Sequence, residues 1–232
     1  LLIFGLITAF FGNYGQSFFI AWFGESFLQA FNLTNAEYGM AYSGATLVSG
    51  FIIMYAGGLL DRTPLKTFTL ATSAGLATAC FILYAASEFW HLVLALFLLR
   101  FCGQGLMFHI AFTTMARYFF KNRGKAIGIV GFGMPLGEAI LPALAVLLIA
   151  TIGWRETWLI LGLTLPILFW PAVHALLKQA KDLANKNVEI FKDEISAVTI
   201  SSRKGDVVVD TDEGPGSARP EKIPTLRPAF KK

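Results

Sequence analysis

The sequence predicts an all-α membrane protein in which six transmembrane helices precede a polar tail. The first observation is composition: 55% of the 232 residues are hydrophobic and 15% are charged, whereas soluble domains carry roughly 25% charged residues. The second is the placement of charge. Residues 1–177 contain 8 basic and 6 acidic side chains, and residues 178–232 contain 11 and 9. The third is a set of six apolar runs, each long enough to cross a hydrocarbon core of about 30 Å as a helix. A soluble enzyme and a nucleic-acid-binding module are excluded, although the pI is about 9.1.

The six apolar runs set the expected organisation of the chain. The spans are expected at residues 1–22, 38–60, 67–87, 90–115, 126–150 and 157–177. Only helices and closed barrels satisfy the backbone within lipid, and these runs lack the alternation of barrel strands. Residues 1–177 should therefore form a six-helix bundle, and residues 178–232 a water-exposed tail. Within the tail we expect an amphipathic helix over 178–200, either on the membrane surface or solvated, followed by disorder over 201–232.

Basic residues gather in alternate loops between the expected spans. They are Arg62 and Lys66 after the second span, Arg117, Lys121, Arg123 and Lys125 after the fourth, and Lys178 and Lys181 after the sixth. The intervening loops carry Glu25, Glu37, Glu88, Arg155 and Glu156. Because Lys and Arg are enriched in cytoplasmic loops, we expect the N-terminus and the tail to be cytoplasmic. The membrane is expected to be a plasma membrane or a bacterial inner membrane.

The sequence contains no pattern that predicts catalysis, a cofactor or a metal. Cys80 and Cys102 lie in apolar runs, without the number or spacing of a disulfide framework or a metal site. We find no nucleotide-binding glycine loop, no metal-binding His–Glu helix and no Gly-x-Ser-x-Gly elbow. We therefore expect a protein that is not an enzyme and that is not driven by ATP.

One basic residue, Arg100, lies inside an expected span. A charge at mid-membrane costs at least about 2.5 kcal/mol, so it is rarely idle. With α-helical spacing, Arg100, Gln104, Met107 and Ala111 share one face, which we expect to line a polar cavity. Arg100 would then contact a substrate anion or take part in proton coupling; the alternative is a pair with an acid that locks helices together. His109 falls on the opposite side and is interpreted as a packed or interface histidine.

Other polar residues inside the spans are candidates for the same cavity. Glu138 is the only acid within the six runs, and a lone buried carboxylate tends to be protonated unless it is paired. We interpret it as a proton-coupling or substrate-binding residue, or as half of a static ion pair with Arg100 or with a part of the protein outside this chain. Asn13, Gln16 and Ser17 form a stripe on the first span that either lines the cavity or hydrogen-bonds a neighbouring helix.

The loop after the second span carries a recognisable pattern. It contains Gly57, three further residues, Asp61, then Arg62 and, four residues later, Lys66. This pattern resembles the helix 2–3 signature of the major facilitator superfamily of secondary transporters. The resemblance implies that these four residues form a conformational latch, which stabilises one end-state of the transport cycle against the second half of the protein.

Further segments resemble the same superfamily. The run from Arg100 to Gly105 is similar to its helix 4 motif, and Gly128, Gly137 and Pro142 are similar to its helix 5 packing signature, which is associated with exchangers. The turn at residues 153–155 resembles its external helix 5–6 turn. The loop over residues 118–126, followed by a glycine-rich span, resembles the monocarboxylate-carrier-like branch.

The resemblance implies the N-terminal half of a twelve-helix transporter, built as a three-plus-three inverted repeat. A small organic anion such as a carboxylate would be carried by gradient-driven alternating access, as symport or antiport, with a proton as the coupling ion. The expected partners are this substrate, the lipid bilayer and a second six-helix half, and none is a nucleic acid. The chain would then be a fragment, with residues 178–232 as the central cytoplasmic loop.

Two alternatives remain open from the sequence. One is a six-helix protein that is complete as written and works as a homodimeric scaffold. The other is an intramembrane enzyme, for which Ser43 and His109 are the available nucleophile and base.

Overall fold

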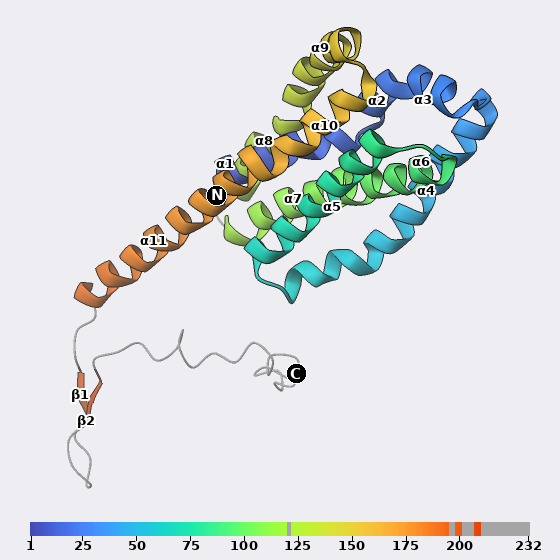
Figure 1. Cartoon of the computed structure of the whole chain (residues 1–232). Coiled ribbons are helices and arrows are strands. Elements are labelled where there is room, and N and C mark those ends of the chain that lie inside the picture. Colours follow the sequence, from blue (N-terminus) through green and yellow to red (C-terminus); the bar gives the residue numbers. More distant parts are fainter. Residues whose placement is uncertain (120–121, 195–197, 201–206, 210–232) are drawn as a thin grey trace, which may run out of the picture. The chain divides into compact units, whose positions relative to one another are not determined.

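The computed structural model describes residues 1–119, 122–194, 198–200 and 207–209. The chain divides into two compact units, Leu1–Gln179 and Ala180–Lys232. The first unit is a bundle of helices packed side by side (Figure 1).

The bundle is helical throughout. In chain order its elements are α1 (Leu2–Gly12), the 3-10 helix η1 (Asn13–Gly15), α2 (Ser17–Ile20), the 3-10 helix η2 (Ala21–Phe23), α3 (Gly24–Phe31), α4 (Asn35–Ala56), the 3-10 helix η3 (Gly57–Asp61), α5 (Leu65–Ala85), α6 (Phe89–Leu98), the π-helix η4 (Leu99–Met107), α7 (Phe108–Tyr118), α8 (Arg123–Gly131), α9 (Gly133–Ile152), α10 (Trp154–Thr164), the π-helix η5 (Leu165–Phe169) and α11 (Trp170–Glu194). Five helical stretches of the described chain are long and apolar enough to cross a membrane, and a bent pair makes a sixth. The prediction of an all-helical membrane fold is confirmed.

The second unit begins within α11, which continues to Glu194. It also contains two short antiparallel strands, β1 (Val198–Ile200) and β2 (Val207–Val209). This hairpin falls partly in the stretch predicted to be disordered, and was not predicted. The β-branched residues of both strands favour an extended backbone. The rest of residues 201–232 lies outside the described residues.

The first span is bent, and the expected single helix over residues 1–22 is wrong in this respect. Its two parts, Leu2–Gly15 and Ser17–Phe31, meet at 46°. Gln16 at the junction is extended, with φ −79° and ψ 148°. Apolar composition predicts a span but does not reveal that one residue leaves the helix and frees neighbouring backbone groups.

The bend lies where the first span touches the fourth. A Cβ atom added to Gly103 would lie 2.8 Å from the Cα of Gly15, and a Cβ atom on Gly15 would meet the carbonyl oxygen of Leu99. Only two glycines permit this approach, because any side chain would push the helices apart. The carbonyl of Gly15, next to the bend, is thereby brought against the fourth span.

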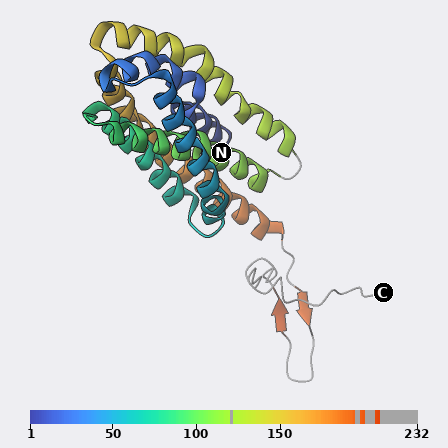
Figure 2. The ribbon, with the colours of Figure 1, turned by 90° about the vertical axis from the view of Figure 1, so that its right-hand side faces the viewer.

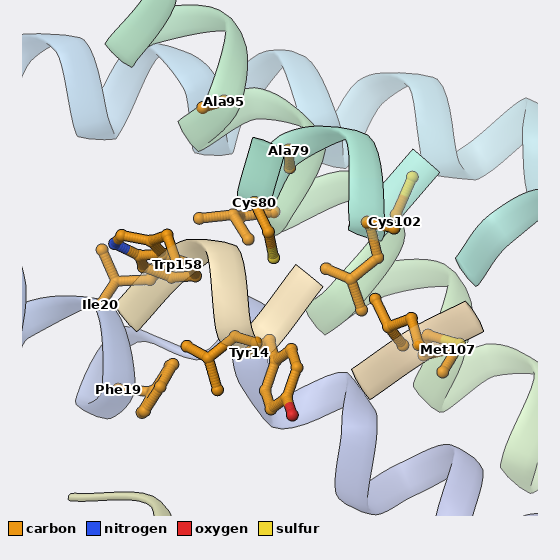
Figure 3. Close-up of a cluster of buried hydrophobic side chains, with 14 of the residues drawn as sticks. Tyr14, Phe19, Ile20, Ala79, Cys80, Ala95, Cys102, Met107 and Trp158 are labelled. Atoms are coloured by element: carbon orange, nitrogen blue, oxygen red, sulfur yellow. The ribbon is translucent and has the colours of Figure 1, made fainter. Parts of the chain in front are cut away.

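Aromatic side chains fill the core on the other side of the first span. Figure 3 shows Phe19 and Ile20 of the first span beside Trp158 of α10, with Tyr14 farther from the indole. The ring centroids of Phe19 and Trp158 are 5.8 Å apart in an edge-on arrangement, a favourable geometry for aromatic pairs. Cys80 and Cys102, whose side chains belong to the same core, are free and buried.

Replacing Gly15 with Ala is expected to destabilise the bundle. The new methyl group overlaps the backbone of the fourth span, and overpacking of this kind costs roughly 1–3 kcal/mol. Thermal unfolding of the purified protein in detergent would show a lower midpoint. The matched control is Gly50→Ala in α4, where an added Cβ meets nothing within 4 Å and stability should be kept or slightly raised. Equal midpoints for the two variants would contradict the close contact.

Candidate functional site

Arg100 lies in a polar cluster where the first, second and fourth spans meet. Its side chain is buried, with 7% exposed. The Nε atom donates to Thr46 Oγ1 at 3.1 Å, and Nη1 donates to the carbonyl of Gly15 at 3.0 Å and to Ser17 Oγ at 3.1 Å. The guanidinium carbon lies 5.3 Å from the centre of the Tyr42 ring. We call these five residues the arginine cluster.

The arginine cluster solvates a positive charge without neutralising it. A carbonyl and two hydroxyl groups accept its hydrogen bonds, and the face of Tyr42 attracts the cation. Among the residues that the structure describes, no carboxylate forms an ion pair with Arg100, and its Nη2 makes no hydrogen bond. The site therefore keeps a net positive charge and one donor nitrogen with which an anion could pair.

The predicted face through Arg100 is wrong beyond Gln104. The segment around these residues, η4, is a π-helix, whose i→i+5 bonding shifts the later residues around the axis. Met107 and Ala111 are fully buried in the hydrophobic core. Gln104 is half-buried, and it makes no side-chain hydrogen bond to a described residue.

The polar stripe of the first span divides at the bend. Asn13 is fully buried, and its amide nitrogen donates to the carbonyls of Phe10 and Gly133, both at 3.0 Å. Of the two roles predicted for Asn13, these contacts favour helix packing. Its Oδ1 has no partner within the described chain. Gln16 is the extended residue at the bend and is 9% exposed, and Ser17 belongs to the arginine cluster.

Glu138 lies on an exposed face of α9. Figure 2 shows α8 and α9 running along one edge of the bundle. Within residues 1–119 and 122–182 no basic side chain pairs with Glu138. The alternative of a static pair with Arg100 is therefore wrong for this structure. Glu138 is placed to meet a group outside the bundle or in the space beside it.

The predicted packing residues on the fifth span behave differently from one another. A Cβ atom on Gly137 would overlap the Asn13 side chain, so this glycine packs directly against the first span. Gly128 is exposed and meets no atom within 4 Å, so it has no packing role inside this bundle. Pro142 lies within α9 and is half-buried. Gly133, not singled out from the sequence, is the second close contact, because its Cβ would lie 2.6 Å from the Leu6 carbonyl oxygen.

The end of the bundle formed by η3, the start of α5 and the end of α7 is here called the basic end. Asp61 forms an ion pair with Arg117, and Arg117 Nη1 donates to the Leu60 carbonyl at 3.3 Å. His109 lies on α7 with Arg117, and its Nε2 donates to the Gly57 carbonyl at 3.1 Å. Two side chains of α7 thus hold the end of the second span.

The four predicted latch residues do not form a single cluster. Gly57 and Asp61 bind α7, whereas Lys66 contacts a different helix: its Nζ donates to His174 Nδ1 of α11 at 2.8 Å. Arg62 is exposed and has no side-chain partner among the described residues. The loop therefore connects the second span to the fourth and the third span to the sixth.

Sequence reasoning missed Tyr42, Thr46 and His174. Tyr42 and Thr46 lie four residues apart in α4 and so share a face, which is a weak signal in a span with many small and polar residues. His174 was not distinguishable from an ordinary histidine near a helix end. Arg117 was counted among loop charges, although its eight-residue distance from His109 puts both on one face of a helix.

The fold and the arginine cluster together define a polytopic helical membrane protein with a buried cation. The chain belongs to the Major Facilitator Superfamily, whose family model matches residues 2–214. The predicted resemblance to this superfamily is confirmed, as is the prediction that the chain is not an enzyme. The chain is an integral membrane protein.

Three relatives illustrate how far the similarity extends. The MFS-type transporter eupM of Phoma sp. is 29% identical over 121 residues, which are 52% of this chain and 43% of that protein. Human monocarboxylate transporter 11 is 39% identical over 88 residues, or 38% and 19% of the two chains. A mitochondrial acetyl-CoA acetyltransferase of Gibberella zeae is 58% identical over 40 residues, or 17% and 9%.

The chain covers less than half the length of each of these relatives. The similarity to a monocarboxylate transporter agrees with the predicted likeness to the monocarboxylate-carrier-like branch. The matched segment is 9% of the acetyltransferase, which is too short to indicate that enzyme's fold. No feature of the bundle explains this match.

The ion pair between Asp61 and Arg117 is expected to contribute little to stability. Both side chains are partly exposed, at 65% and 41%, and exposed pairs contribute roughly 0.2–1 kcal/mol. A double-mutant cycle with Asp61→Asn and Arg117→Gln, followed by unfolding in detergent, should give a coupling energy within that range. Arg117→Gln should cost more than Asp61→Asn, because it also removes the bond to the Leu60 carbonyl. A coupling energy above about 2 kcal/mol would instead indicate a buried, water-excluded pair.

Proposed function

We propose that this chain is the N-terminal half of a secondary transporter that moves a small organic anion, such as a carboxylate, across a membrane. Transport is driven by an ion gradient and proceeds by alternating access. A second six-helix half completes the protein, and residues 178–232 form the central cytoplasmic loop between the halves. The N-terminus and this loop are cytoplasmic, in a plasma membrane or bacterial inner membrane. Membership of the superfamily and the similarity to a monocarboxylate transporter support this function.

The observation that carries the proposal is the uncompensated charge of Arg100. Its bonds to Thr46, Gly15 and Ser17 fix the guanidinium plane, so a substrate carboxylate meets a preorganised donor. A planar guanidinium matches the two oxygens of a carboxylate. A static lock would instead place an acid against Arg100, and the described residues provide none.

The arginine cluster also lies where movements of the spans would change the contacts of Arg100. Its members come from the bent first span, the second span and the π-helical part of the fourth span. A small rotation of any of these helices would break a hydrogen bond to Arg100 and change its exposure. Gln16 precedes Ser17 in the first span, and Gln104 follows Arg100 by four residues in the fourth span. Both are proposed to complete the substrate contacts. Asn13 holds the first span against the start of α9 through its bond to the Gly133 carbonyl and is proposed to support the site without contacting the substrate.

Glu138 is proposed as the proton-coupling residue. It is the only acid inside the predicted spans, and its exposed place on α9 allows it to gain and lose a proton without breaking an existing ion pair. Arg100 and Glu138 would thus act separately, the first on the substrate and the second on the coupling ion.

The contacts at the basic end are proposed to work as the latch. Asp61 held by Arg117, and Gly57 held by His109, fix the end of the second span in one state. Arg62 has no partner among the described residues and is proposed to reach the second half of the transporter. Breaking these contacts would free the second span to move.

Arg100→Gln is expected to abolish most substrate uptake. The change removes a charge-assisted hydrogen bond of about 1.5–3 kcal/mol, which corresponds to roughly a 10- to 100-fold loss. The measurement is uptake of radiolabelled small carboxylates by proteoliposomes that contain the intact gene product, with and without an imposed pH gradient.

Two further variants make this result interpretable. Arg100→Lys keeps the charge but not the planar geometry and should recover part of the uptake. Arg123→Gln removes an exposed arginine at the start of α8, whose guanidinium binds, among the described residues, only the Ala116 carbonyl, and should leave uptake unchanged. Thermal midpoints identify any variant that fails to fold. Normal uptake by folded Arg100→Gln would make Arg100 structural and overturn the assigned role.

Glu138→Gln is expected to separate transport from proton coupling. An amide cannot release a proton, so uptake driven by the pH gradient should be lost while exchange of substrate for substrate is retained. Both activities are measured in the same proteoliposomes. Retention of gradient-driven uptake would exclude Glu138 as the coupling residue, and loss of both activities would make it a substrate or packing residue.

A further inference from the structure

We propose that a groove between α5 and α11, at the basic end of the bundle, binds one anionic phospholipid. Lys66 would contact the phosphate of the headgroup, and the apolar wall of the groove would hold an acyl chain. This site is separate from the arginine cluster and plays no part in the transport chemistry proposed above.

The groove combines a cation with an apolar wall. It has a volume of about 480 Å³ and is lined by Lys66, Thr67, Leu70, Ala71, Ala74 and Trp170. Four of these six side chains are apolar. The five from α5 are spaced by three or four residues along one face of the helix. The small side chains of Ala71 and Ala74 leave the space open.

Two contacts fix the direction of the groove. Lys66 Nζ lies 2.8 Å from His174 Nδ1, and Trp170 Nε1 donates to Ser73 Oγ at 3.0 Å. The third and sixth spans therefore run antiparallel here. At a rise of 1.5 Å per residue, Lys66 and Ser73 are about 10 Å apart along the helix. The groove thus leads from the basic end toward the middle of the span.

Lys66 is available to an anion. An ammonium group carries three donors, and the contact with His174 uses one of them. No carboxylate forms an ion pair with Lys66 in the described part of the chain. The bond to His174 also directs the lysine toward α11, so its charge lies at the exposed edge of the groove that Lys66 lines.

The surroundings favour a lipid over a soluble anion. Lys66 is the second residue of a helix that is long and apolar enough to cross the membrane, so it lies at the level of lipid headgroups. Trp170 is 37% exposed and lies beside Ser73, about 10 Å deeper than Lys66, at the depth where an acyl chain would lie. Basic pockets between membrane helices on the cytoplasmic side bind anionic headgroups. A phospholipid satisfies both the cation and the apolar wall, whereas inorganic phosphate satisfies only the cation.

The test is lipid binding to the purified protein in detergent, measured by native mass spectrometry. Phosphatidylglycerol and phosphatidylcholine with identical acyl chains are supplied in equal amounts. The protein should retain phosphatidylglycerol in preference to phosphatidylcholine. Lys66→Gln should lower this preference about fivefold, which corresponds to roughly 1 kcal/mol per basic residue at a membrane surface. Ala71→Trp, which fills the groove and leaves Lys66 in place, should lower the binding of both lipids.

The control is Lys125→Gln, which removes an exposed cation of α8 and should leave the preference unchanged. An equal loss in this variant would attribute the preference to general charge and overturn the site. Equal retention of the two lipids by the unaltered protein would overturn it as well. Displacement of phosphatidylglycerol by excess inorganic phosphate would replace the lipid with a free anion as the occupant. Thermal midpoints of all variants exclude misfolding as a cause.

Discussion

The contact between Gly15 and Gly103 is the constraint on which the polar centre of the bundle depends. Two helix backbones touch there, and such an approach is possible only because neither residue has a side chain. The contact coincides with the bend at Gln16, where the first span leaves the helical path. A bend without a close neighbour would leave backbone carbonyls unsatisfied in an apolar medium. Here Arg100 donates a hydrogen bond to the Gly15 carbonyl. The bend supplies an acceptor for the buried cation, and the cation satisfies a backbone group at the bend.

The distribution of charge follows the same logic. Arg100 is surrounded by neutral oxygen atoms and an aromatic face, whereas the ion pair between Asp61 and Arg117 lies at the end of the bundle, where both side chains reach water. A buried ion pair gains attraction at the cost of removing two charges from water. A single buried cation with neutral partners avoids the second desolvation, and it keeps its attraction for a charge that arrives later.

Much of the fold could be predicted because lipid restricts the choices. Apolar runs of about 20 residues must be helices, and the basic loops together with the Gly57-to-Lys66 pattern indicate the superfamily. Arg100 could be identified as a candidate site residue because placing a charge within a membrane span costs free energy. The bend at Gln16 and the π-helix at Leu99–Met107 could not be predicted, because neither changes the mean hydropathy of its span.

The contacts of the candidate site were harder to predict for the same reason. The π-helix moved Met107 away from the predicted face and into the core. Tyr42 and Thr46 belong to a helix whose polar residues form no continuous stripe, so their meeting with Arg100 follows only from the way three spans pack. The pairing of Lys66 with His174 joins residues 108 positions apart, which no local pattern reveals.

The π-helix also decides how this span tolerates a change in its length. A π turn takes one more residue than an α turn. Deleting one residue from this segment would therefore let it close as an α-helix, with His109 and Arg117 still facing the second span. Deleting one residue from the regular helix between His109 and Arg117 would instead turn Arg117 by roughly 100° and separate it from Asp61. The π-helix is therefore a place where the fourth span can lose a residue while its basic end keeps its contacts.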